Sequence, residues 1–441
     1  MNKKVVYTSN PIAGGLQGTL RMPGDKSISH RAVMFASLAN GSSRISGLLE
    51  GEDVLATLAA FRAMGVKAEG PEQGELSIEG VGMQGLQAPE TDLDMGNSGT
   101  AMRLMSGILA AQQFASKLVG DESLSGRPMR RVTVPLTAMG ARCATDDNGC
   151  PPIHIRKVDR LEPIDYKLPM ASAQIKSCVL LAGMYADGVT SVTEPAPTRD
   201  HTERMLNAFG YPCVSEPKGD GVTTVRIEGG GELQATDIDV PGDISSAAFF
   251  MVAASIIPGS DLTLQHVGVN PTRTGVVDVL RSMGASIDFT NPRDVGGEPV
   301  ADIRVRYAGL KGIEVDPKYV PLAIDEFPIL CVAAACAEGE TVISGAEELR
   351  HKESDRIAAM VAGLRAVGVD VEERKDGMKV SGGEIEGGTV ESFHDHRIAM
   401  SFAIAGAVCK TNIIIDDCSN VATSFPNFPE LANSAGMNIE H

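Results

Sequence analysis

Two acidic residues in short polar motifs have the chemistry needed for proton transfer. Asp325 belongs to an acidic pair, Asp325-Glu326, directly before the apolar run FPIL, and Glu353 lies between Lys352 and Arg356 in RHKESDR. A carboxyl group can accept or donate a proton if its surroundings hold it in the required protonation state. The alternatives are a helix N-cap from the acidic pair and a surface ion-pair helix for Lys352, Glu353 and Arg356, with the two cations on one face if this segment is helical.

Cations and hydroxyls are concentrated in GDKSISHR, which contains Lys26, Ser27 and Arg31. Further arginines stand in LSGRPMRR (Arg127) and HDHR (Arg397). Arginine grips carboxylates and phosphates with a planar fork, and lysine supplies a point charge, so these motifs favour a small anionic ligand, a phosphate above all. The alternatives are a structural salt bridge for Arg31 and a solvated surface for Arg127.

Metal binding has only weak support in the sequence. The two histidines of HDHR, His394 and His396, alternate as metal ligands sometimes do, but the sequence offers no clear third ligand. The eight cysteines form no CxxC pair, which argues against zinc and fits free thiols in a reducing compartment. We therefore expect no metal.

The overall composition limits the class of protein. The chain has 441 residues, 43% of them apolar, and a formal net charge of −18. An acidic chain does not suit nucleic acid, whose phosphates need a basic face, although a local basic site for a small anion remains compatible. The longest apolar runs are too short to span a bilayer, and the N-terminus lacks the apolar core of a signal peptide. We expect a cytoplasmic protein with no membrane partner.

A repeat runs through the whole chain. Six segments each read as the end of an amphipathic helix, a glycine and then a strand, and their glycines are Gly65, Gly140, Gly210, Gly284, Gly368 and Gly436. Glycine just past a helix end is the usual C-terminal cap. The first copy predicts helix, strand, helix, strand, strand, with another strand before it. Its first helix is apolar nearly all round and must be buried.

Six copies divide naturally into two groups of three, although one continuous solenoid is the alternative. We predict one domain at 23–242 and a second at 1–22 plus 243–441, the opening strand completing the second domain. Each buried helix starts with a short polar motif, in chain order GDKSISHR, GNSGTAMR, MASAQIKS, GDISSAAF, IDEFPIL and HDHRIAM. Helix N-termini attract anions, so these starts would line a cleft between the domains that suits a polyanionic substrate.

The ordered set of motifs resembles the 5-enolpyruvylshikimate-3-phosphate (EPSP) synthase family. The motifs are GDKSISHR, GNSGTAMR, RPM, ASAQIKS, IDE, KESDR and DHR, and the resemblance covers residues 11–441. PMASAQIKS, PTRDHTE and DEFPILCVAAACAEG are similar to the bacterial branch called class II. No single motif is decisive, but the ordered set is highly specific.

The resemblance implies an α/β protein with the two-domain enolpyruvyl transferase fold, each domain holding three βαβαββ units around buried helices. It implies transfer of the enolpyruvyl group of phosphoenolpyruvate to the 5-hydroxyl of shikimate 3-phosphate, in the pathway to chorismate and the aromatic amino acids. It implies no metal and no organic cofactor. We take a monomer as the default.

The resemblance also assigns roles to residues. Asp325 would accept the hydroxyl proton, Glu353 would protonate the methylene carbon, and Lys26 would assist catalysis. The residues implied for shikimate 3-phosphate are Lys26, Ser27, Arg31, Ser172, Ala173, Gln174, Arg199, Asp325 and Lys352. Those implied for phosphoenolpyruvate are Lys26, Asn97, Gly99, Arg127, Gln174, Arg356 and Arg397.

Two positions bear on the phosphoenolpyruvate site. Thr423 in VATSFP stands where the better-known branch of the family has a lysine, which puts one phosphate contact in doubt. Gly99 stands where some glyphosate-tolerant relatives carry alanine, so we expect glyphosate to inhibit this protein.

Two other functions compete with this one. UDP-N-acetylglucosamine enolpyruvyl transferase shares the fold and phosphoenolpyruvate. It typically has Lys-Asn where this chain has Lys26-Ser27, and it usually carries a cysteine in the loop where this chain reads GDESLSG. A repeat scaffold that binds proteins is the non-enzyme alternative, and it would not require cations at the starts of the repeats.

Overall fold

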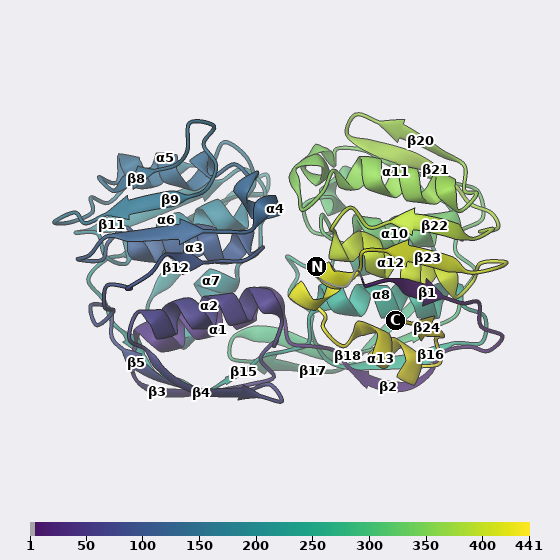
Figure 1. Ribbon diagram of the computed structural model, residues 1–441, viewed down its shortest axis with the longest axis horizontal. Coiled ribbons are helices and arrows are strands. Elements are labelled where there is room, and N and C mark those ends of the chain that lie inside the picture. Colours follow the sequence, from purple (N-terminus) through teal and green to yellow (C-terminus); the bar gives the residue numbers. More distant parts are fainter. Residues whose placement is uncertain (1–4) are drawn as a thin grey trace. The chain divides into compact units, whose positions relative to one another are not determined.

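The computed structural model describes residues 5–441, which divide into two compact units (Figure 1). Unit 2 consists of Gly24–Val240 and the short segment Val295–Glu298. Unit 1 consists of the chain up to Pro23, Pro241–Asp294 and Pro299–His441. Each unit has its own cluster of buried apolar side chains, so each has a separate hydrophobic core.

The first copy of the repeat has the predicted order of elements. It runs α1 (Lys26–Leu38), β3 (Ala39–Ser46), α2 (Glu52–Ala63), β4 (Lys67–Glu72) and β5 (Glu75–Val81). On β5 alternate residues are buried, as expected for a strand that packs one face on a core. The sequence prediction for this copy is confirmed.

The helix that opens each copy is buried, and the second helix is partly exposed. The opening helices are α1, α3 (Gly99–Leu109), α6 (Ala173–Gly183), α8 (Ile244–Ile256), α10 (Phe327–Ala335) and α12 (His396–Gly406). The second helices are α2, α5 (Arg130–Ala138), α7 (His201–Ala208), α9 (Gly275–Ser282), α11 (Arg356–Ala366) and α13 (Phe428–Ser434). A short extra helix, α4, spans Glu122–Ser125. The burial matches the sequence, because a helix that is apolar on every side has no face to offer to water.

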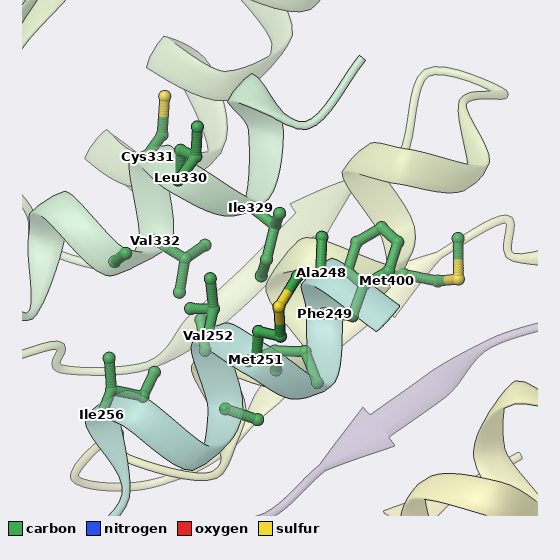
Figure 2. Close-up of a cluster of buried hydrophobic side chains, with 14 of the residues drawn as sticks. Ala248, Phe249, Met251, Val252, Ile256, Ile329, Leu330, Cys331, Val332 and Met400 are labelled. Atoms are coloured by element: carbon green, nitrogen blue, oxygen red, sulfur yellow. The ribbon is translucent and has the colours of Figure 1, made fainter. Parts of the chain in front are cut away.

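The three opening helices of unit 1 pack against one another. Figure 2 shows this contact, with Met251 and Val252 of α8 directed toward Ile329 and Val332 of α10. All four of these side chains are buried. A packed centre of this kind holds the starts of the helices in fixed positions.

The six glycines that mark the repeats all have left-handed backbone angles. Their φ values lie between 75° at Gly210 and 112° at Gly436. Each follows the capping residue of α2, α5, α7, α9, α11 or α13. A side chain is strained at such an angle, which is why glycine recurs there.

Unit 2 contains three sheets with a common plan. Their strand orders are β14-β3-β5-β4, with β15 also on β3, then β6-β7-β9-β8 and β10-β11-β13-β12. The strands β14, β15, β6 and β10 are each parallel to the strand beside them. The remaining strands of each sheet are antiparallel to their neighbours. The strands not yet given are β6 (Leu93–Asp94), β7 (Ser116–Val119), β8 (Arg142–Ala144), β9 (Ile153–Arg156), β10 (Asp165–Lys167), β11 (Val189–Glu194), β12 (Cys213–Gly219), β13 (Val222–Glu228), β14 (Leu233–Gln234) and β15 (Ile238–Asp239).

Two sheets of unit 1 follow the same plan and are completed by the opening of the chain, whereas its third sheet has three antiparallel strands. The sheets are β22-β23-β1-β24, β17-β18-β16-β2 and β19-β21-β20. The early strands β1 (Tyr7–Ser9) and β2 (Gln17–Arg21) pair with strands that come more than 200 residues later. The others are β16 (Asp261–Gly268), β17 (Ser286–Val295), β18 (Glu298–Arg306), β19 (Glu340–Ile343), β20 (Val371–Arg374), β21 (Gly377–Ser381), β22 (Gly388–Glu391), β23 (Ile413–Asp416) and β24 (Ile439–Glu440).

Three short 3₁₀ helices lie in unit 1: η1 (Pro317–Tyr319), η2 (Glu347–His351) and η3 (Ser419–Thr423). Within residues 5–441, no helix has the length and apolar character that crossing a bilayer requires. The longest helices, α1 and α8, have 13 residues each.

Candidate active site

The polar motifs of unit 2 lie at the starts of its buried helices and are fixed by helix caps. Asp25 accepts a hydrogen bond from the Ile28 amide at the start of α1. Ser98 and Ser172 cap α3 and α6 in the same way. These caps satisfy amide groups that a helix leaves free at its N-terminus, and they set where the following side chains begin.

Arg31 is the centre of the first group of polar residues. Its Nε donates to Thr202 Oγ1 at 2.7 Å, Nη1 to the Ser27 carbonyl at 2.9 Å, and Nη2 to Ser177 Oγ at 2.9 Å. Ser177 and Thr202 also bond to each other at 2.7 Å. We call Ser27, Arg31, Ser177 and Thr202 the Arg31 cluster.

The Arg31 cluster keeps a positive charge among neutral partners. Arg31 is only 3% exposed, and its three acceptors are two hydroxyl oxygens and one carbonyl oxygen. Burial lowers the pKa of Arg31 to about 10, although Glu203 and other carboxylates at longer range partly oppose this. The guanidinium is still charged at neutral pH, and a bound anion would offset the free-energy cost of its desolvation.

Three more of the predicted residues lie close to α1 and α6. Lys26, the first residue of α1, forms an ion pair with the buried Asp53 of α2. Gln174 accepts from Arg103 Nη1 at 2.6 Å and donates to Thr100 Oγ1 at 2.9 Å, so it joins α6 to α3. Arg199 is half-buried in the segment between β11 and α7, and its charge lowers the pKa of Arg31.

Asn97, Gly99 and Arg127 come together at the start of α3. Arg127 Nη2 donates to Asn97 Oδ1 at 2.8 Å and to Ser123 Oγ at 3.1 Å. A Cβ atom added to Gly99 would lie 3.5 Å from Arg127 Nη1 and 3.2 Å from Arg103 Nη1. The glycine therefore lets two guanidinium groups approach the backbone closely. Arg127 is half-buried here and is not the solvated surface residue of the alternative interpretation.

Arg356 is the centre of a second group of polar residues, in unit 1. Its Nε donates to Asp395 Oδ2 at 2.8 Å, Nη2 to Glu353 Oε2 at 2.7 Å, and Nη1 to Asp325 Oδ1 at 3.3 Å. Lys352 Nζ lies 3.1 Å from the same Asp325 oxygen. We call these five residues the Arg356 cluster.

The electrostatics of the Arg356 cluster differ from those of the Arg31 cluster. Arg356 is 1% exposed and Asp395 is fully buried. Burial alone lowers the pKa of Arg356, but Asp395, Glu353 and Asp325 outweigh it and raise the pKa above its usual range. Burial raises the pKa of Asp395, but the charge and hydrogen bond of Arg356, together with the charge of His396, lower it, and the net effect is a pKa below the usual value. Both groups are therefore ionised at neutral pH.

Neither of the two alternative interpretations of this region holds in full. Lys352 caps η2 and Asp355 caps α11, so residues 352–355 are not helical, and Lys352 and Arg356 meet because both contact Asp325. Asp325 is not the N-cap of α10 either. That position is held by Glu326, whose side chain makes no capping hydrogen bond.

Arg397 lies in the first turn of α12, where Asp395 accepts a hydrogen bond from its amide. Its Nη1 is 3.6 Å from Glu326 Oε1, and the same Glu326 oxygen accepts from Ser245 on α8. The starts of α8, α10 and α12 are thus connected by polar side chains within unit 1.

The histidines of HDHR do not gather metal ligands. His394 is exposed and pairs with Asp417 at 2.5 Å, whereas His396 is buried on α12. Across residues 5–441, no group of three or more histidine, cysteine, aspartate or glutamate side chains is placed to hold a metal ion. Thr423 is buried, and its hydroxyl donates to the Asn420 carbonyl at 2.8 Å.

Several residues that contact the predicted site residues were not identified from the sequence. Asp395 stands in the HDHR motif, but its pairing with Arg356 across 39 positions has no local signal. His30 was likewise missed, although it is buried and joins Thr57 of α2 to Ser98, the cap of α3. Its pKa is lowered well below the usual value, mainly by burial and then by Lys26 and Arg31, so the ring is neutral. The remaining ones are Asp53, Arg103, Ser177 and Thr202.

The two clusters suit different steps of a reaction. The cations of unit 2 that have neutral partners are suited to binding an anion. The Arg356 cluster instead holds several carboxyl groups in place beside cations, which is an arrangement for moving protons. A reaction that joins an anionic acceptor to a second anion through proton transfer would use both.

Three comparisons with known proteins agree. Residues 12–431 match the family model described as EPSP synthase (3-phosphoshikimate 1-carboxyvinyltransferase). The chain is 61% identical over 439 residues to the 3-phosphoshikimate 1-carboxyvinyltransferase of Methylococcus capsulatus, covering 100% of this chain and 99% of that one. The same enzyme of Hydrogenovibrio crunogenus is 58% identical over 441 residues, with the same coverage. A solved EPSP synthase structure from Acinetobacter baumannii superposes with a TM-score of 0.88 at 52% identity, covering 100% of both chains.

Proposed function

The chain belongs to the EPSP synthase family, and on that premise we infer that it transfers the enolpyruvyl group of phosphoenolpyruvate to shikimate 3-phosphate. The reaction releases phosphate and serves the synthesis of aromatic compounds. The predicted family, enzyme class and two-domain enolpyruvyl transferase fold are confirmed. The alternative, a UDP-N-acetylglucosamine enolpyruvyl transferase, is not favoured, because the matched relatives are named for the shikimate reaction.

We propose that shikimate 3-phosphate is bound in unit 2, and the observation that carries this is the Arg31 cluster. Arg31 is buried and charged, and it has only neutral hydrogen-bond acceptors. A phosphate or carboxylate would supply the missing negative charge. The other residues that the family resemblance assigns to this substrate are Lys26, Ser27, Ser172, Ala173, Gln174 and Arg199 in unit 2, and Asp325 and Lys352 in unit 1.

We propose that Asp325 takes the proton from the 5-hydroxyl as its oxygen attacks C2 of phosphoenolpyruvate, while Glu353 gives a proton to the methylene carbon. A C–O bond forms, and the double bond becomes a methyl group in a tetrahedral intermediate. The methyl group then returns a proton to Glu353 as the bond from C2 to the phosphate oxygen breaks. The carbon–carbon double bond re-forms, and the leaving phosphate takes the proton held by Asp325. Both carboxyl groups accept a hydrogen bond from Arg356, which supports fixed positions for them.

The second substrate, phosphoenolpyruvate, carries a carboxylate and a phosphate and needs several cations. We propose that Arg127, Arg356 and Arg397 bind it together with Lys26, Asn97, Gly99 and Gln174. Support comes from the pairing of Arg127 with Asn97 at 2.8 Å and from the partial exposure of Arg397, whose side chain is 14% accessible. Thr423 is not included, because its hydroxyl is engaged with the Asn420 carbonyl.

We propose that glyphosate inhibits this protein at the same site. The supporting observation is the lack of a side chain at Gly99, where an added methyl group would lie 3.2 Å from Arg103 Nη1, a tight contact, and 3.5 Å from Arg127 Nη1, an ordinary one. Gly99→Ala should raise the inhibition constant for glyphosate, with a smaller change in the KM for phosphoenolpyruvate. A wild-type inhibition constant far above that KM would contradict the proposal.

We propose a cytoplasmic monomer. The eight cysteines are all free thiols, which fits a reducing compartment, and a net charge of −18 disfavours self-association. Light scattering at several protein concentrations tests the monomer, and a mass that rises toward twice 46.3 kDa would overturn it.

The experiment for the function as a whole measures phosphate release from phosphoenolpyruvate. One reaction contains shikimate 3-phosphate and a parallel reaction contains UDP-N-acetylglucosamine. We expect release in the first only. Release in the second only would replace the proposed acceptor, and no release from folded protein in either would reject the function.

A further inference from the structure

A lysine is buried without any exposure in unit 2, two residues beyond the proposed substrate residue Gln174. Lys176 lies on α6 and is 0% exposed. Its Nζ lies 2.7 Å from Glu203 Oε1 on α7 and 3.1 Å from Glu194 Oε2 at the end of β11. Both glutamates are about as buried as the lysine, with 4% exposure each. We call Lys176, Glu194 and Glu203 the lysine triad.

The members of the triad are charged, and the lysine forms ion pairs with both glutamates. Burial lowers the pKa of Lys176, but the two glutamates raise it by more, so the lysine keeps its proton at neutral pH. The second oxygen of Glu203 is buried and has no hydrogen-bond partner. Lys176 is therefore the group that compensates Glu203, and removing it would leave a buried carboxylate without its cation.

Each member of the triad is connected, directly or through one neighbour, to the Arg31 cluster or to Arg199. Ser177 follows Lys176 on α6, and Thr202 precedes Glu203 on α7; both hydroxyls accept hydrogen bonds from Arg31. Glu194 accepts from Thr198 Oγ1 at 2.6 Å, and Thr198 is the neighbour of Arg199. The triad thus fixes three segments that carry or orient the phosphate-binding groups.

The triad also decides how much negative charge faces Arg31. Among the groups that raise the pKa of Arg31, Glu203 has the largest effect. Because Glu203 makes its ion pair with Lys176, its charge is already matched. Without Lys176, Glu203 would be free to attract Arg31 and to compete with a substrate anion for it.

We propose that Lys176 is a positioning residue for shikimate 3-phosphate, which holds Glu203 away from Arg31 and fixes the segments that carry Ser177, Thr202 and Arg199. This inference rests on the proposed function. It assigns Lys176 no contact with substrate, and it predicts that the residue affects one substrate more than the other.

The test compares Lys176→Met with wild type. We expect the KM for shikimate 3-phosphate to rise by about tenfold or more, because small misplacements of binding groups are costly, and the KM for phosphoenolpyruvate to change much less. The matched control is Lys117→Met, which removes a lysine of the same unit from a partly exposed pair with Asp92 and should leave both constants unchanged.

Glu194→Gln keeps the test decisive if Lys176→Met does not fold. It preserves the size of the side chain but weakens the links to Lys176 and Thr198, so we expect a smaller rise in the same KM. Thermal unfolding and calorimetric titration with shikimate 3-phosphate, made on each variant, separate lost binding from lost folded protein.

The outcomes separate this inference from the function on which it rests. A wild-type enzyme that shows no activity with shikimate 3-phosphate overturns both. An active wild type, together with folded variants whose two KM values stay unchanged or rise equally, overturns the positioning role alone. A selective rise in the KM for shikimate 3-phosphate supports it.

Discussion

Two buried arginines near helix starts, Arg31 in unit 2 and Arg356 in unit 1, have opposite surroundings. Arg31 donates to two hydroxyls and a carbonyl, and burial lowers its pKa to about 10. Arg356 donates to three carboxylates, which raise its pKa above the usual range. The two side chains are almost equally buried, at 3% and 1% exposure. The difference therefore lies in the partners and not in the solvent.

This difference distinguishes a buried cation that can bind an anionic substrate from one whose charge is already paired with carboxylates. The desolvation of Arg31 is not offset by an adjacent anion, so binding an anionic substrate would stabilise it. Arg356 is already matched by its carboxylates, and its main effect is to hold Asp325 and Glu353 in place. The fold repeats one supersecondary motif, but the residues near the helix starts differ between unit 1 and unit 2 and give the two units different roles.

The largest expected effect is on the carboxyl groups of the Arg356 cluster. Glu353→Gln and Asp325→Asn each keep the shape of the side chain but remove its ability to donate or accept a proton. We expect kcat to fall by about 10²- to 10⁴-fold, as is typical for loss of a general acid or base, with smaller changes in both KM values. Steady-state kinetics check this, with the exposed Asp316→Asn as the control. A rise in KM at constant kcat would assign these residues to binding instead.

The next effect contrasts the two arginines directly. Arg356→Met would leave three carboxylates facing one another, and breaking a buried ion pair costs about 3–5 kcal/mol. Arg31→Met would leave only neutral groups unpaired, for which we expect about 1–3 kcal/mol. Urea unfolding of both variants measures the two costs. If Arg31→Met is the more destabilising variant, the comparison is wrong.

A third test measures how the free energy of unfolding changes at acidic pH. The pKa of Asp395 in the folded protein is below its ordinary value of 3.8, with Arg356 opposing the effect of burial. Its contribution to stability is therefore complete above that value and is lost as the pH falls below it toward the folded pKa. The free energy of unfolding measured against pH should decline in this window, and the decline should be shallower in Asp395→Asn. Arg31→Met should keep the wild-type slope, because the acceptors of Arg31 do not titrate there.

The smallest expected effect comes from a single hydroxyl. Ser177→Ala removes one acceptor of Arg31, and a hydrogen bond of this kind contributes about 1 kcal/mol, or roughly a fivefold change in the dissociation constant of shikimate 3-phosphate. Ser37→Ala is the matched control, because Ser37 bonds only within its own helix, to the Val33 carbonyl. Equal calorimetric constants for Ser177→Ala and wild type would mean that this hydroxyl does not orient Arg31 for binding.

Much of the local structure could be predicted from the sequence. The six glycines with positive φ, the six buried helices and the order of elements in the first copy follow from periodicity and from the limits that side chains place on backbone angles. The family could be predicted because its motifs are ordered along the whole chain. The assignment of substrate contacts to Lys26, Arg127 and Arg397 remains a prediction.

The sequence by itself therefore determined the repeat, the buried helices and the polar motifs at their starts, because each depends on neighbours within one turn or one strand. Only the tertiary structure decided which of these residues become partners. Asp395 pairs with Arg356 across 39 positions, and Arg31 reaches Thr202 across 171. Neither separation along the sequence corresponds to the repeat of a helix or a strand, so no sequence pattern reveals these pairs. Contacts of this length depend on how separately formed helices pack, and they decide whether a buried cation is compensated or available.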